Sequence, residues 1–122
     1  MAIELNHTIV HVRDQAQSAQ FFAETLGLGA PERFASFTVV RTHNSVSLDF
    51  ISTPDEFDRQ HYAFSVNEVE FDQILARIKN RGLTFWADPA KSKVNETYTY
   101  RNGRGVYFED PSGHFLEILT WR

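Results

Sequence analysis

The sequence contains no cysteine. A disulfide framework, a thiolate nucleophile and a cysteine-ligated zinc site are therefore excluded. Positive charge is also scarce, because 12 Lys and Arg face 16 Asp and Glu, for a formal net charge of −4. This balance argues against a nucleic-acid-binding protein, which would show a basic patch. No apolar run approaches the length needed to cross a bilayer.

The first ten residues, MAIELNHTIV, lack the basic segment and long apolar stretch of a signal peptide. We therefore expect a cytoplasmic protein that does not contact a membrane. Hydrophobic residues make up 42% of the 122 positions and include 11 Phe. This is enough apolar material for the core of one domain, or of two small half-domains that share a core.

Hydrophobic periodicity predicts a strand over residues 5–12 and a helix over 14–26 in the first half of the chain. Asp14 is a suitable N-cap for this helix, and Gly27 a suitable stop. A hairpin turn is expected at THNS, residues 42–45. The remaining strands of this half are predicted around residues 33–34, 37–41 and 46–51.

The second half of the chain follows the same order. A strand over 61–66 precedes a helix over 69–80, with Asn67 as N-cap and Glu70 at the capping-box position. Gly82 ends this helix as Gly27 ends the first. Further strands are predicted at 84–87, 97–100, 105–109 and 115–120.

Aligning the two halves indicates an internal duplication. NHTIVHV lies over QHYAFSV, and SLDFI lies over FLEIL. We interpret the chain as a single domain over residues 1–122, made of one module at about 1–52, a linker at about 53–60 and a second module at about 61–122.

The duplication places chemistry-bearing residues at equivalent positions. His7 and His61 lie on the first strand of each module, and Asp49 and Glu117 on the last. A lone strand histidine is more often a hydrogen-bonded core residue, and a lone strand glutamate usually faces solvent. A carboxylate within an apolar strand is nevertheless costly unless it is paired or binds a cation. The presence of a histidine and a carboxylate at equivalent positions of both modules therefore favours a divalent metal site.

ELNHTIV, HYAF and GVYFEDPSGHFLEI together resemble the vicinal oxygen chelate superfamily. This superfamily includes glyoxalase I, extradiol dioxygenases, fosfomycin-resistance thiol transferases and bleomycin-resistance proteins. The resemblance extends over essentially the whole chain. It implies an α+β fold in which two tandem βαβββ modules form a curled mixed sheet around a central metal cavity. It also implies a homodimer.

The resemblance further implies particular site residues. The family's metal ligands match His7, His61 and Glu117. A fourth ligand, present in relatives similar to glyoxalase I, matches Asp49, but Asp is one methylene shorter than the usual Glu, so both interpretations of Asp49 stay open. Tyr107 matches a position that lines the cavity in relatives similar to the fosfomycin enzymes. A phenol there would donate to a metal-bound oxygen, and a plain core tyrosine is the alternative.

A site with three protein ligands leaves coordination positions for substrate, which is typical of catalytic sites. The His and carboxylate donors suit one Mn, Fe, Ni, Co or Zn ion per site. The implied function is a metal-dependent lyase, isomerase, thiol transferase or dioxygenase. In such an enzyme, the metal chelates adjacent oxygens of a small substrate and stabilises an oxyanion or enolate. The alternative is a metal-free, ligand-sequestering protein of the bleomycin-binding type.

Other polar residues have simpler interpretations. His114, in the DPSGH turn, is expected to be structural, and His43 to be exposed in a hairpin turn. Arg101 and Arg104 flank Gly103, where they could attract an anionic substrate, although a solvated loop is the simpler expectation.

Overall fold

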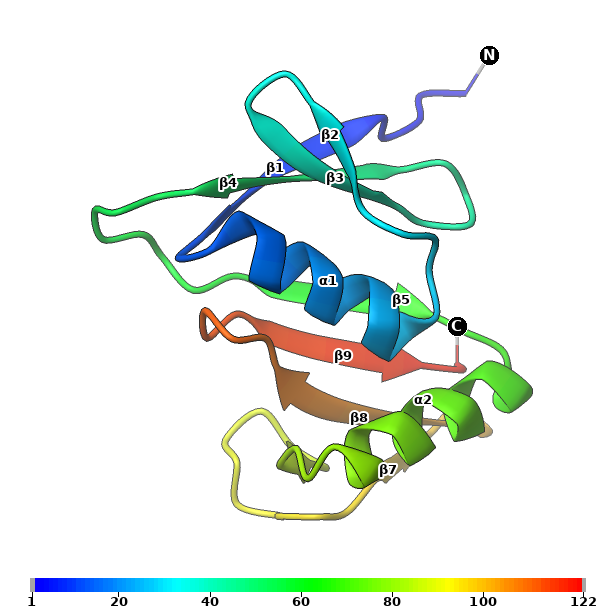
Figure 1. Cartoon of the computed structure of the whole chain (residues 1–122). Coiled ribbons are helices and arrows are strands. Elements are labelled where there is room, and N and C mark those ends of the chain that lie inside the picture. Colours follow the sequence, from blue (N-terminus) through cyan, green and yellow to red (C-terminus); the bar gives the residue numbers. More distant parts are fainter. Residues whose placement is uncertain (1, 122) are drawn as a thin grey trace. The chain divides into compact units, whose positions relative to one another are not determined.

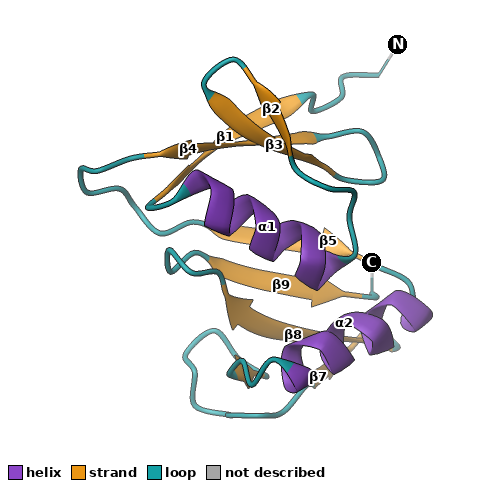
Figure 2. Ribbon diagram, viewed as in Figure 1, coloured by secondary structure: helices purple, strands orange, loops and turns teal. Residues whose placement is uncertain are grey.

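The computed structural model describes residues 2–121, and its backbone divides between Asp58 and Arg59 into two compact units (Figure 1). Each unit has one helix and its own β-sheet, in which parallel and antiparallel pairings are mixed (Figure 2). Within residues 2–121, no helix is both long and apolar enough to span a membrane.

The first unit has a four-stranded sheet in the order β1-β4-β3-β2. The first and last strands of the unit, β1 and β4, are parallel neighbours, and the other pairings are antiparallel. The elements are β1 (His7–Val12), α1 (Gln15–Leu26), β2 (Glu32–Phe34), β3 (Phe37–Arg41) and β4 (Ser47–Ser52).

Helix α1 has the ends that the sequence predicts. The Asp14 carboxylate accepts a hydrogen bond of 3.0 Å from the backbone N–H of Gln17, and Gly27 adopts a left-handed conformation with a φ of 74°. The helix covers one face of the sheet, where the ring of Phe22 meets that of Phe50 edge-on at 4.8 Å between centroids. Both rings are fully buried.

The second unit repeats this order, with one strand interrupted. Its sheet runs β5-β9-β8-β6, and β5 and β9 are parallel neighbours. Strands β6 and β7 pair with different parts of the same edge of β8, so together they take the place of one continuous strand. The elements are β5 (His61–Ser65), α2 (Glu68–Asn80), β6 (Phe85–Trp86), β7 (Tyr98–Tyr100), β8 (Gly103–Glu109) and β9 (Phe115–Leu119).

Helix α2 begins with the predicted capping box, in which Asn67 and Glu70 bond each other's backbone N–H. Arg104 on β8 holds this helix: its guanidinium donates to Glu68 at 2.8 Å and to Asp72 at 2.5 Å. The same group lies 4.2 Å from the ring centroid of Phe71. Arg104 therefore lies on a strand rather than in a solvated loop. Its charge is paired with Glu68 and Asp72, so it is not available to attract a substrate.

The predicted α+β class and the two tandem modules are confirmed, and both helices begin within one residue of their expected starts. The prediction for the first strand is wrong at its start, because β1 begins at His7 rather than at residue 5. The pairing with β4 begins at His7, and Leu5 is 67% exposed, so its side chain is not part of the core. The assignment of residues 1–122 to a single domain stays a prediction.

Replacing Phe22 with Ala should lower the free energy of unfolding by about 3–5 kcal/mol, because the change leaves a cavity beneath Phe50. Phe21 is the matched control, since it is adjacent on α1 but only half-buried. Phe21→Ala should cost about 1 kcal/mol. Urea denaturation of the three proteins measures both losses, and equal losses would contradict the packing described for α1.

Candidate metal centre

The centre of the second unit's sheet carries a histidine and a carboxylate in contact. In the parallel pairing of β5 with β9, His61 lies opposite Phe115, and Glu117 is two residues further along β9. Side chains two residues apart on a strand point to the same face, so His61 and Glu117 share one face of the sheet. The distance between His61 Nε2 and Glu117 Oε1 is 3.1 Å.

The Glu117 side chain is only 7% exposed, whereas that of His61 is 48% exposed. Burial of a carboxylate is unfavourable unless its oxygens are hydrogen-bonded or its charge is balanced. Tyr98 supplies one hydrogen bond, from its hydroxyl to Glu117 Oε2. The Trp121 N–H in turn donates to the Tyr98 oxygen at 2.7 Å. Glu117 is thus surrounded by polar groups that suit a ligand as well as a structural acid.

A second tyrosine faces the same pair. Tyr107 on β8 lies opposite Glu117 in the antiparallel pairing, and its ring centroid is 5.9 Å from that of His61. Burial, followed by the neighbouring Glu117 charge, raises the pKa of Tyr107. The pKa of Tyr98 is raised by burial and then by its hydrogen bond to Glu117. Both phenols therefore keep their protons at neutral pH and are hydrogen-bond donors.

The first unit repeats the same diagonal arrangement. His7 lies opposite Ser47, and Asp49 is two residues further along β4. Here, however, the buried carboxylate accepts a hydrogen bond of 2.5 Å from the Ser47 hydroxyl. The exposed His7 pairs through Nδ1 with Asn6 at 2.8 Å, which leaves its Nε2 without a hydrogen-bond partner among residues 2–121.

Two of the four predicted ligands, His61 and Glu117, are therefore in direct contact, and the predicted Tyr107 lies beside them. Among residues 2–121, no group of three or more His, Asp or Glu side chains is gathered closely enough to hold a metal ion. His7 and Asp49 share a face of the first unit's sheet, where His7 is hydrogen-bonded to Asn6 and Asp49 to Ser47.

Tyr98 was not predicted as a site residue. The available signal was Gly105, a glycine within a predicted strand, which often marks the close approach of another group. A Cβ at this position would lie 2.2 Å from the Tyr98 ring. The structural role expected for His114 is confirmed, because its buried ring accepts a hydrogen bond of 3.0 Å from the Gln60 backbone N–H.

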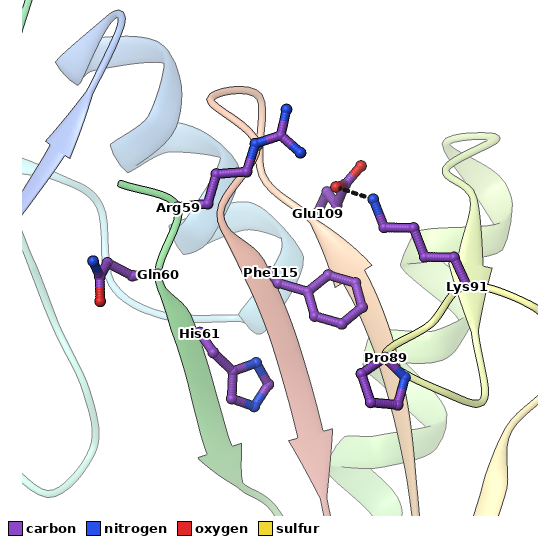
Figure 3. Close-up of a pocket in the computed structure, with 8 residues that line it drawn as sticks. Arg59, Gln60, His61, Pro89, Lys91, Glu109 and Phe115 are labelled. Carbon is purple, nitrogen blue, oxygen red and sulfur yellow. Dashed lines mark hydrogen bonds and ion pairs between the residues drawn. The ribbon is translucent and has the colours of Figure 1, made fainter. Parts of the chain in front are cut away.

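An open cleft of about 240 Å³ begins at His61 (Figure 3). Its apolar part consists of Phe115 and Pro89. The charged part includes Lys91, which bonds Glu109 at 2.6 Å and also lies 5.6 Å from the ring centroid of Phe115. The cleft thus combines a flat apolar wall with a charged rim beside one of the predicted ligands.

The family model described as the Glyoxalase/Bleomycin resistance protein/Dioxygenase superfamily matches residues 4–118. Among solved structures, the oxidase ChaP-H1 is 53% identical, with a TM-score of 0.96 over 99% of this chain and 98% of that one.

Two curated relatives are transferases. The glutathione transferase FosA of Serratia marcescens is 34% identical over 97% of this chain and 81% of its own length. The metallothiol transferase FosB of Shouchella clausii is 29% identical, over 95% of this chain and 79% of its own length. All three of these relatives are named as enzymes, which favours catalysis over ligand sequestration.

The family match covers nearly the whole chain, and the relatives that are 34% and 53% identical to it are a transferase and an oxidase. The chain is an enzyme that belongs to the glyoxalase/bleomycin resistance protein/dioxygenase superfamily.

Proposed function

We propose that this enzyme binds one divalent metal ion through His7, His61 and Glu117, and uses it to oxidise a small organic substrate that carries two adjacent oxygens. The oxidant in this proposal is dioxygen. The observation that carries the proposal is the contact between His61 Nε2 and Glu117 Oε1.

The spacing of these two atoms fits metal ligation. Two ligand atoms that each lie about 2.1 Å from one metal ion, at right angles, are about 3 Å apart. The observed separation is 3.1 Å. A buried carboxylate beside an imidazole nitrogen is also a donor pair that suits first-row divalent metals. The residues of the second unit therefore fit two of the three proposed ligands.

His7 is the proposed third ligand. It occupies in the first unit the strand position that His61 occupies in the second, and in both units the carboxylate lies two residues beyond the partner of the histidine. In a homodimer, the His7 that completes the site belongs either to the same chain or to the partner. We propose that Asp49 is not a ligand, because its hydrogen bond to Ser47 already satisfies the shorter side chain.

Two histidines and one carboxylate are also the ligand set of non-haem Fe(II) oxygenases, so iron is the metal that we favour. When bound, the metal supplies Lewis-acid polarisation of the substrate oxygens and a binding position for dioxygen. The 53% identity to an oxidase favours oxidation over thiol transfer. The second candidate, transfer of a thiol, is supported by the 34% identity to a glutathione transferase.

The side chains around the pair have separate tasks in this proposal. The Tyr107 hydroxyl stays protonated and donates a hydrogen bond to a substrate oxygen next to His61. Phe115 supplies a flat apolar wall for the substrate body, and its ring stacks on Tyr107 at 5.1 Å. The cleft rim at Lys91 interacts with a polar substituent.

We also propose a homodimer in the cytoplasm. Large apolar side chains of the first unit are exposed: Ile3, Leu5 and Phe34 are 103%, 67% and 68% accessible. Burial of such side chains against a second copy would be favourable.

Light scattering tests this assembly. The purified protein should have twice the mass of one chain, and the double variant Leu5→Ser/Phe34→Ser should have the mass of a monomer. A monomeric parent protein would contradict this assembly.

Metal analysis tests the ligand set. The purified protein, reconstituted anaerobically with Fe(II), should hold roughly one ion per site. Variants His7→Ala, His61→Ala and Glu117→Ala should each lose most of it, since each removes one of three ligands. His43→Ala is the matched control because His43 lies exposed in a turn. Full retention of iron by the His61 and Glu117 variants would contradict the site, and retention by the His7 variant alone would exclude His7.

Two probes test whether the bound metal is open to substrate. Nitric oxide, a stand-in for dioxygen, should give the electron paramagnetic resonance signal of an iron–nitrosyl complex. The absorption spectrum of 4-nitrocatechol, a compound with two adjacent oxygens, should shift on addition to the Fe(II) protein. Neither change should occur in Glu117→Ala. An iron-loaded protein that responds to neither probe would have a closed structural site, and the oxidase proposal would be wrong.

A further inference from the structure

The two oxygens of Glu117 have different partners. Oε1 faces Nε2 of His61 at 3.1 Å, whereas Oε2 accepts the hydrogen bond of the Tyr98 hydroxyl. The Tyr98 oxygen is itself held by the Trp121 N–H at 2.7 Å. A chain of hydrogen bonds therefore runs from the indole to the carboxylate and occupies only one of its oxygens.

The position of this chain is built into β8. A Cβ on Gly105 would lie 2.2 Å from the Tyr98 ring, and a Cβ on Gly103 would lie 2.7 Å from the Trp121 side chain. Each glycine thus lets one aromatic group approach the strand, closer than any other residue would allow. The tyrosine hydroxyl is directed at Glu117 by packing as well as by hydrogen bonding.

We propose that Tyr98 is a positioning residue, which holds Oε2 of Glu117 so that this carboxylate binds the metal through Oε1 alone. This inference rests on the metal site proposed above. Hydrogen bonds to a ligating carboxylate orient it and tune the metal. A carboxylate that binds through one oxygen occupies one coordination position rather than two, which leaves more positions for the substrate oxygens and for dioxygen.

The phenol also affects the electronic properties of the ligand. A hydrogen bond to Oε2 withdraws electron density from the carboxylate, so a metal bound at Oε1 receives less of it. Loss of this bond should therefore stabilise Fe(III) relative to Fe(II) and lower the reduction potential of bound iron. A residue that served only the fold would not change the potential of a site that still binds iron.

The test compares Tyr98→Phe with Tyr100→Phe. Both changes remove one hydroxyl from β7, but Tyr100 is 48% exposed and its ring packs against Trp121 at 4.8 Å. Fe(II) affinity is measured anaerobically by competition with a chelator, and coordination is followed through the visible bands of the Co(II)-loaded proteins. Tyr98→Phe should lower the affinity on the order of 10–100-fold. Tyr100→Phe should leave it unchanged.

The Co(II) spectrum and the reduction potential distinguish positioning from folding. A carboxylate that gains a second bond to the metal raises the coordination number, so the Co(II) bands of Tyr98→Phe should weaken. The potential of its bound iron should fall. Trp121→Phe, which keeps the phenol but removes its N–H partner, should change both properties in the same direction and by less. If Tyr98→Phe does not fold, Trp121→Phe alone tests the proposal.

Each outcome identifies which proposal fails. A parent protein that binds no metal would overturn the metal site and, with it, the role of Tyr98. The other outcome is a parent protein that binds metal and two variants, Tyr98→Phe and Trp121→Phe, with the same Fe(II) affinity, Co(II) bands and reduction potential as the parent. This result would overturn only the role of Tyr98.

Discussion

The parallel pairing of the first and last strands of each unit determines the geometry of the candidate site. In the second unit, this register places Glu117 two residues beyond the partner of His61, on the same face of the sheet. A shift of one residue would turn the carboxylate into the opposite face, where Leu116 and Ile118 are fully buried. The apolar face therefore fixes the register, and the register brings the imidazole and the carboxylate into contact.

The duplication shows how one arrangement can acquire two uses. Both units have a histidine and a carboxylate on the same diagonal, but the longer Glu117 reaches His61, while the shorter Asp49 bonds Ser47 on its own strand. Only the second unit adds tyrosines around its carboxylate. A difference of one methylene thus accompanies the proposed division between a ligand in one unit and a structural acid in the other.

Much of this organisation follows from local sequence signals. Helix caps at Asp14 and Asn67 and the alignment of the two halves predicted both modules and the equivalence of their histidines. The contacts of Tyr98 and Arg104 could not be predicted in the same way, because they depend on which segments pack against β8. The side chain of a tyrosine 19 residues from Glu117 becomes its partner only after β7, β8 and β9 have assembled.

The central proposal is that His7, His61 and Glu117 bind a single metal ion. Anomalous X-ray diffraction from crystals loaded with Mn(II) tests it most directly. The account predicts one strong peak within bonding distance of His7 Nε2, His61 Nε2 and Glu117 Oε1, with Tyr98 still bonded to Oε2. A peak at other residues, or loaded crystals in which His61 and Glu117 are bonded only to each other, would contradict it.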